Sequence, residues 1–161
     1  MTDFDRAVEA VLRIEDPKLA GVVTTDSGGV TRWGISKRAY PSTDVANLTL
    51  DQAKFLYKTD YWTEASCDDY AWPLSLFVFD AAVNQGVDAA IRMLQEVAET
   101  PVDGRVGVNT LKAIGKREPV ELAAKYMARR AVRYMGDRNA DQYLRGWLKR
   151  LFLISRSAYV A

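Results

Sequence analysis

Apolar residues recur at helical spacing through most of the chain. Between residues 2 and 15 they lie three or four positions apart, which predicts a first helix that ends before Pro17. The segment 72–83 is apolar on nearly all sides, as is typical of a helix in the middle of a core. Thr49 with Gln52 resembles a capping box and predicts the start of another helix. We expect further helices near residues 91–97, 110–114, 119–135 and 140–157.

The pattern changes between residues 21 and 33. Two short β-prone pieces, 22–25 and 30–33, flank Asp26-Ser27-Gly28-Gly29, a sequence that is typical of a hairpin turn. Strands this short are not stable alone, so the hairpin is expected to pack on helices. The fold class that follows is mainly α (α+β), a helical domain with one small β-hairpin.

The composition of the chain excludes several classes of catalytic mechanism and metal site. The 161 residues include no histidine, which excludes Ser-His-Asp, Cys-His and His-ligated metal mechanisms. The single cysteine, Cys67, can form neither an internal disulfide nor a thiolate zinc site. Carboxylate acid–base catalysis on a neutral substrate becomes the leading enzyme class, with no cofactor and no metal.

The first 15 residues do not resemble a secretory signal, because charged residues interrupt the apolar positions. The sequence also has no run of about 18 apolar residues. We therefore expect a protein made in the cytoplasm, without stable insertion into a membrane.

Charge is distributed unevenly along the chain. Residues 1–111 carry 10 basic and 17 acidic side chains, whereas residues 112–161 carry 12 basic and 4 acidic ones. This asymmetry predicts either an anionic partner for the last two helices or pairing with the acidic half inside the fold. A nucleic-acid partner is not expected, because the net charge is only +1 and no DNA-binding pattern occurs.

Glu15 is the carboxylate best placed for chemistry. It lies at the predicted C-terminal end of the first helix, where the helix dipole disfavours an anion. The neighbouring Asp16 and partial burial act in the same direction, so we expect a raised pKa for Glu15. A carboxylic acid that keeps its proton near neutral pH suits a general acid for glycosidic bond cleavage. The alternative is an ordinary solvated glutamate at a frayed helix end.

Other candidates surround this acid in the predicted arrangement. The hairpin returns toward the end of the first helix, so Asp26 is expected to face Glu15 across a cleft, with Thr31 holding a water or a sugar hydroxyl. The aromatic residues Trp33, Tyr61 and Trp62 are candidates for cleft walls that bind sugar rings, although most aromatic side chains belong to cores.

These segments resemble a known family. Glu15 followed by residues 26–41 (DSGGVTRWGISKRAYP) is similar to the start of glycoside hydrolase family 108, the lysozyme-like N-acetylmuramidases that are mostly phage endolysins. The second half resembles the peptidoglycan-binding module paired with that family. The matching pieces are residues 79–86 (FDAAVNQG), 93–95, 102–107, 109–111 and 146–150.

The resemblance implies one lysozyme-like domain over residues 1–161. A catalytic lobe, 1–70, would carry the hairpin at the cleft, and a helical lobe, 71–161, would resemble the binding module. Glu15 would protonate the leaving oxygen of the β-1,4 bond between N-acetylmuramic acid and N-acetylglucosamine. Asp26 and Thr31 would position water or stabilise charge, and Asn84 and Gln85 would contact the substrate.

Two departures from the family pattern stand out: Glu15-Asp16-Pro17 replaces Glu-Gly-Gly, and Ser27 replaces a common proline. The resemblance also implies a monomer, made in the host cytoplasm, that reaches peptidoglycan in the periplasm or cell wall after the membrane is permeabilised. The basic C-terminal helices would then face an anionic envelope surface. The alternative is a non-catalytic peptidoglycan-binding or secretion-assisting protein.

Overall fold

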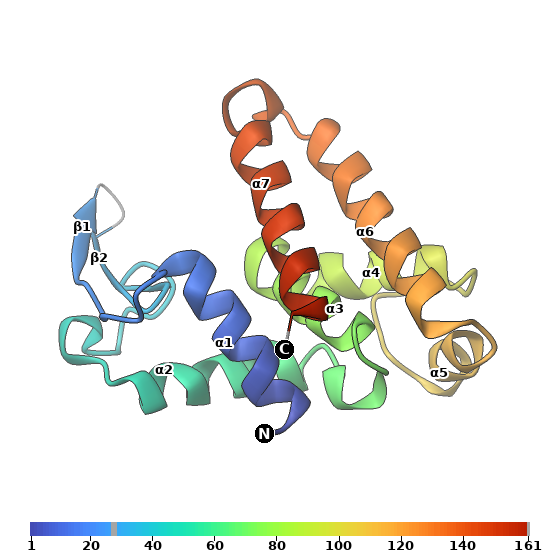
Figure 1. Cartoon of the computed structure of the whole chain (residues 1–161), viewed down its shortest axis with the longest axis horizontal. Helices are drawn as coiled ribbons and strands as arrows, with labels where there is room; N and C mark the ends of the chain where they lie inside the picture. The colour runs from blue at the N-terminus through green and yellow to red at the C-terminus, as the bar shows by residue number, and fades with distance from the viewer. Residues whose placement is uncertain (27–28, 161) are drawn as a thin grey trace.

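The computed structural model describes residues 1–26 and 29–160. Seven α-helices and a small antiparallel sheet make up most of this part of the chain (Figure 1). The helices are α1 (Asp3–Glu15), α2 (Leu50–Tyr57), α3 (Leu74–Gln85), α4 (Val87–Val97), α5 (Val108–Gly115), α6 (Pro119–Met135) and α7 (Ala140–Tyr159). The strands are β1 (Thr24–Asp26), β2 (Gly29–Arg32) and β3 (Ile35–Ser36). Shorter turns are η1 (Val45–Asn47), the π-helical η2 (Lys58–Thr63) and η3 (Cys67–Asp69). The mainly α fold class is confirmed.

Helix α3 lies at the centre of the core, as its continuous apolar sequence predicts. It contacts α1, α4, α6 and α7, and every residue from Leu74 to Ala82 is buried. The helix begins two residues later than expected and continues to Gln85. One of its buried residues is Asp80, a carboxylate that needs charged or polar partners in this position.

The hairpin is present and has one more strand than expected. Thr24 pairs with Thr31 across β1 and β2, and Thr31 pairs with Ser36 across β2 and β3. The third strand follows a tight reversal at Trp33 and Gly34, which both have positive φ. Ser27 and Gly28, at the predicted turn, lie outside the described residues.

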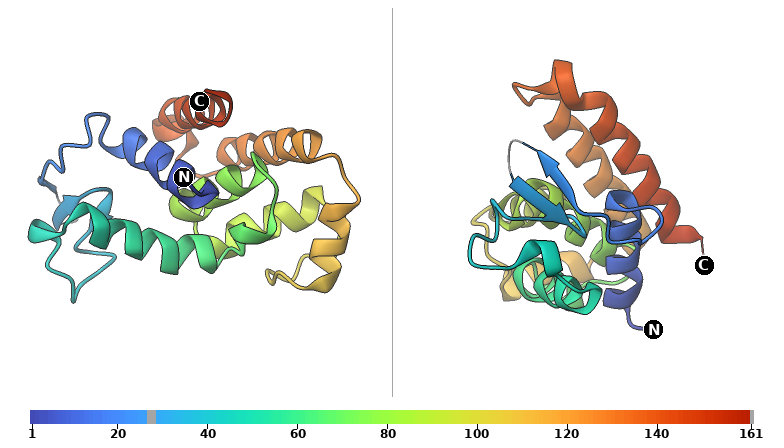
Figure 2. Two further views of the ribbon diagram at one scale, coloured as in Figure 1. Left: turned by 60° about the horizontal axis from the view of Figure 1, so that its bottom comes forward. Right: turned by 90° about the vertical axis from the view of Figure 1, so that its left-hand side faces the viewer.

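Helices α6 and α7 pack against each other and on α3, and the ends that meet at the turn between them extend beyond the rest of the fold (Figure 2). The expected bounds of α6 are confirmed, and α7 continues two residues beyond the expected end. Thr49 and Gln52 form the predicted capping box of α2. Within the described residues, no helix is both long enough and apolar enough to cross a membrane.

Gly34 is held where a side chain does not fit. Its φ is +75°, and an added Cβ would lie 2.5 Å from the hydroxyl oxygen of Tyr57 and 3.0 Å from Cγ of Glu15. We expect Gly34→Ala to lower the free energy of unfolding by more than ~1 kcal/mol. The matched control is Gly146→Ala within α7, where an added Cβ meets nothing within 4 Å. That change should raise the free energy of unfolding by ~0.5–1 kcal/mol through helix propensity. Urea unfolding followed by circular dichroism measures both, and equal effects would contradict this account of Gly34.

Candidate active site

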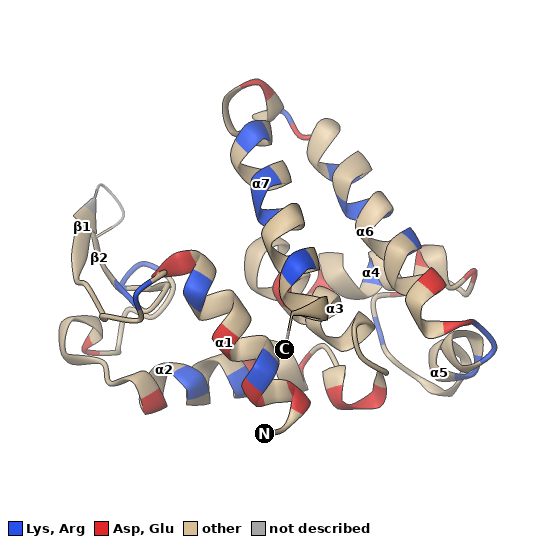
Figure 3. Cartoon of the chain, in the orientation of Figure 1, with Lys and Arg blue, Asp and Glu red and all other residues tan. Residues whose placement is uncertain are grey.

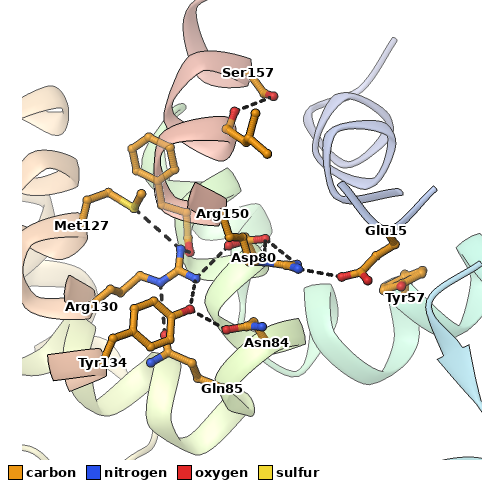
Figure 4. A network of polar contacts seen from close by, with 12 residues as sticks. Glu15, Tyr57, Asp80, Asn84, Gln85, Met127, Arg130, Tyr134, Arg150 and Ser157 are labelled. Carbon is orange, nitrogen blue, oxygen red and sulfur yellow. Dashed lines mark hydrogen bonds and ion pairs between the residues drawn. The ribbon is translucent and has the colours of Figure 1, made fainter. Parts of the chain in front are cut away.

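Glu15 is the last residue of α1 and pairs with an arginine from the far end of the chain. Its Oε1 accepts a hydrogen bond from Nη1 of Arg150 on α7 at 2.6 Å (Figure 4). The Glu15 side chain is 34% exposed, whereas that of Arg150 is 9% exposed. The carboxylate is therefore fixed from the protein side and open to solvent on the other.

Asp80 holds Arg150 in place from the centre of α3. Nε of Arg150 donates to Oδ1 of Asp80 at 2.9 Å, and Nη2 lies 2.8 Å from the same oxygen. Nη2 of Arg130, on α6, donates to Oδ2 of Asp80 at 2.8 Å. We call Glu15, Asp80, Arg130 and Arg150 the ion cluster. Burial opposes the charged form of Asp80, but the two guanidinium groups outweigh it and lower its pKa.

The cluster continues from Arg130 to the C-terminal end of α3. Nε of Arg130 donates to Oε1 of Gln85 at 3.2 Å, and its Nη2 donates to the hydroxyl of Tyr134 at 3.4 Å. The Tyr134 hydroxyl in turn donates to Oδ1 of Asn84. Polar contacts thus run without a break from Glu15 to Asn84 and Gln85 (Figure 4).

The base of the hairpin lies on the other side of Glu15. Gly34 approaches the aliphatic part of the Glu15 side chain, and the buried hydroxyl of Tyr57 donates to the carbonyl of Trp33 at 3.1 Å. Burial, followed by the nearby Glu15 carboxylate, raises the pKa of Tyr57. The expectation that the hairpin returns to the end of the first helix is confirmed at Gly34.

The expected catalytic roles of Asp26 and Thr31, the two candidates on the hairpin, stay predictions. The backbone of Asp26 pairs with Gly29, but its side chain lies outside the described part of the structure. Thr31 lies in the middle of β2, half-buried, with Thr24 and Ser36 as strand partners. Both residues belong to the sheet beside Glu15.

The expectation that both tryptophans line a cleft is wrong. Trp62 is 1% exposed and packs edge-to-face with Phe4 and Phe79, each with ring centroids 5.5 Å away. Trp33 is 8% exposed, and its Nε1 donates to the carbonyl of Leu48 at 3.0 Å. Trp33, between β2 and β3, supplies apolar area through which the small sheet packs on its neighbours, whereas Trp62 lies in η2 and packs on α1 and α3. Tyr61 is half-buried, and its ring centroid lies 5.9 Å from that of Tyr57. It remains a candidate for a cleft wall that binds a sugar ring.

The contacts of Asp16 and the burial of Cys67 are those of residues that support the fold. The Asp16 carboxylate accepts a hydrogen bond from the backbone N–H of Gly21 at 2.7 Å, so it braces the loop that leads to the hairpin. Cys67 is fully buried, and burial raises the pKa of its thiol. Within the described residues, no group of three or more acidic or cysteine side chains is placed to hold a metal ion.

The basic residues of the last two helices divide into two sets. Arg130 and Arg150 pair with buried or half-buried carboxylates, and Arg129 pairs with Glu96. These contacts confirm the expected internal pairing for part of the charge. A second set lies exposed on α6, α7 and the turn between them (Figure 3): Arg133, Arg138, Arg145, Lys149 and Arg156.

The ion cluster is the part of the site that sequence reasoning missed. Asp80 carries the signal that could have found it, because it interrupts a helix that is otherwise apolar. A carboxylate in that position must be paired, and one carboxylate can accept from two arginines. The basic residues of the last two helices were the available partners.

Comparison with known proteins covers nearly the whole chain. Residues 20–86 match the family model described as glycosyl hydrolase 108, and residues 89–152 match a predicted peptidoglycan domain. The first match contains Asp80 and begins after Glu15, and the second contains Arg130 and Arg150. The solved structure of Brucella abortus SagA is similar, with a TM-score of 0.81 and 25% identity over 96% of this chain and 92% of that one. No curated protein matches the sequence.

Removal of the Asp80 charge should destabilise the fold. Asp80→Asn leaves the buried guanidinium of Arg130 without its anion and leaves Arg150 with Glu15 alone, so we expect the free energy of unfolding to fall by ~3–5 kcal/mol. The control Glu96→Gln disrupts the more exposed pair with Arg129 and should lower it by less than ~1 kcal/mol. Urea unfolding measures both, and similar losses would contradict the central role of Asp80.

The effect of Asp80→Asn should also depend on pH. The folded-state pKa of Asp80 is lowered, so its stabilising contribution is complete above its unfolded pKa and is lost as pH falls through the folded value. We therefore expect the stability difference between wild type and Asp80→Asn to shrink below about pH 4. A difference that stays constant across this range would contradict the lowered pKa.

Proposed function

The chain belongs to glycosyl hydrolase family 108 and carries a peptidoglycan domain, and from this premise we propose that Glu15 is the general acid that cleaves its substrate. It is a glycoside hydrolase of the muramidase type, with a lysozyme-like fold, that acts on bacterial peptidoglycan. The bond we propose is the β-1,4 link between N-acetylmuramic acid and N-acetylglucosamine.

The surroundings of Glu15 carry this proposal. Arg150 binds Oε1, which leaves Oε2 as the oxygen that presents a proton to the glycosidic oxygen. As the proton leaves, negative charge develops on the Glu15 carboxylate. The guanidinium of Arg150 is already in position to stabilise that charge, because Asp80 fixes it from behind. An interaction that strengthens as the bond breaks lowers the barrier rather than only binding the substrate.

The hairpin supplies the second half of the proposed mechanism. Asp26 and Thr31 would position the attacking water or stabilise the positive charge on the sugar ring, which carries oxocarbenium character as the bond breaks. The base of the same hairpin packs against Glu15 through Gly34. This packing supports a site in which the acid and the water-positioning groups belong to adjoining elements.

We propose an endolysin role for the enzyme, with action in the periplasm or cell wall after the membrane is permeabilised. An exposed stripe on α7 supports an approach to an anionic envelope surface. Its residues recur three or four positions apart and are all exposed: Arg145, Lys149, Phe152, Arg156 and Tyr159. No acidic residue follows Asp141 in α7, so no carboxylate of that helix interrupts the stripe. Exposed cationic and aromatic residues on one helix face are typical of membrane-surface binding.

Glu15→Gln tests the catalytic proposal. The amide keeps the shape of the side chain but cannot donate a proton as an acid, so we expect release of reducing ends from purified sacculi to fall by at least ~10²–10⁴-fold. Glu9→Gln on the same helix, an exposed partner of Arg13, is the matched control and should keep wild-type activity. Circular dichroism confirms that each variant is folded.

The same assay separates the alternatives. Near wild-type activity of Glu15→Gln would remove Glu15 from the mechanism. Binding of the wild-type protein to sacculi without release of muropeptides would instead indicate a non-catalytic peptidoglycan-binding protein. Asp26→Asn and Thr31→Ala should each reduce turnover, and no effect of either would remove only the hairpin from the mechanism.

Charge reversal on α7 tests the surface proposal. The double variant Arg145→Glu/Lys149→Glu should lose sedimentation with phosphatidylglycerol vesicles, and wild-type binding should weaken as salt screens the charges. Lys112→Glu/Lys116→Glu, on and just after α5, changes the net charge equally and should still bind. Equal loss in both double variants, or binding that is insensitive to salt, would contradict a role for this helix face.

A further inference from the structure

A small pocket opens where the C-terminal end of α3 meets α6 and α7. Its volume is about 170 Å³, and it lies at the end of the polar contacts that begin at Glu15. Six residues line it: Asn84, Gln85, Arg133, Tyr134, Asp137 and Trp147. These side chains offer hydrogen-bond donors, one cation and one anion in a space that fits a single amino-acid residue.

The two amides of this pocket are oriented from inside the protein. Nε of Arg130 can only donate, so the Gln85 atom that faces it is the carbonyl oxygen. The oxygen of Tyr134 accepts from Arg130, so its hydrogen is directed to the carbonyl oxygen of Asn84. Both amides thus use their acceptors internally. In the described part of the chain neither NH₂ group has a protein partner, so both are available to donate to a ligand.

The charged residues of the pocket favour a peptide over a sugar. Arg133 is exposed and forms no ion pair with any other described residue, and Asp137 lies four residues later, in the turn that follows α6. The glycan backbone of peptidoglycan is uncharged where its lactyl groups carry peptides, so it offers Arg133 no ionic partner. The peptide stems carry free carboxylates and amino groups. Trp147 has one face covered by Tyr134, with ring centroids 5.0 Å apart, which reduces the area open to a sugar ring.

We propose that this pocket binds the peptide stem of peptidoglycan. Arg133 and the amide groups of Asn84 and Gln85 hold a stem carboxylate or carbonyl, and Asp137 faces a stem ammonium group. This inference rests on the proposed function, because it assigns the pocket to the same substrate that Glu15 cleaves. Through Arg130 and Asp80, a ligand in the pocket is linked by direct polar contacts to the arginine that holds Glu15.

The test compares two substrates that differ in the peptide and in the lactyl carboxylate that removal of the peptide exposes. Intact sacculi are one, and glycan strands stripped of their stems by an amidase are the other. We expect the wild type to prefer sacculi, and we expect Arg133→Ala to lower the ratio of kcat/KM for sacculi to that for stripped strands about tenfold, as the loss of a charge-assisted hydrogen bond implies. Arg138→Ala removes an exposed arginine from the neighbouring turn that does not line the pocket, and the ratio should stay at its wild-type value.

Binding is measured separately, so that catalysis is not needed for the answer. An isolated stem peptide is titrated into Glu15→Gln and into Glu15→Gln/Arg133→Ala, with tryptophan fluorescence as the signal. Saturable binding is expected in the first and loss of it in the second. Equal loss of activity on both substrates in Arg133→Ala, or no peptide binding to Glu15→Gln, would overturn the proposal. If Glu15→Gln stays fully active, the proposed catalytic role fails, and the titration still decides the pocket.

Discussion

The buried carboxylate of Asp80 sets the arrangement of the helices around it. An ionised group in the core is tolerated only when its charge is matched, and Asp80 is matched by an arginine on α6 and another on α7. Both helices must therefore dock on α3 at positions from which Arg130 and Arg150 reach the same carboxylate. Because Arg150 also binds Glu15, this docking fixes the end of α1 as well.

Glu15 is consequently supported from two directions by parts of the chain that are distant in sequence. Arg150 approaches from α7, and the hairpin approaches through Gly34, whose lack of a side chain lets its backbone lie against Glu15 and the Tyr57 hydroxyl. The support leaves about a third of the acid side chain exposed. A carboxyl group held by neighbouring elements and exposed on one side has the geometry that the proposed proton donation requires.

Local signals in the sequence predict the helices and the hairpin well. They do not predict contacts between residues that are far apart in the sequence. Helix spacing, the Thr49 capping box and the glycine turn each act within a few residues, so the helices and the hairpin follow from them. The identity of Glu15 as a helix-end acid follows in the same way. Its partner Arg150 lies 135 residues away, and nothing local distinguishes it from the exposed arginines of α7. The prediction that Trp33 and Trp62 line a cleft is wrong for a related reason. The local sequence around an aromatic residue is the same whether its side chain lies in a core or in a cleft.

The ion cluster also bears on how the two matched regions work together. The boundary between them falls after residue 86, at the α3–α4 junction, yet Asp80 lies before it and both arginines lie after it. Separating the regions would leave a buried charge unpaired on each side, so neither is electrostatically complete alone. The peptidoglycan region therefore contributes more than affinity to the enzyme. It supplies the cation that holds Glu15, and the basic residues that it does not use in this way remain exposed on α6 and α7.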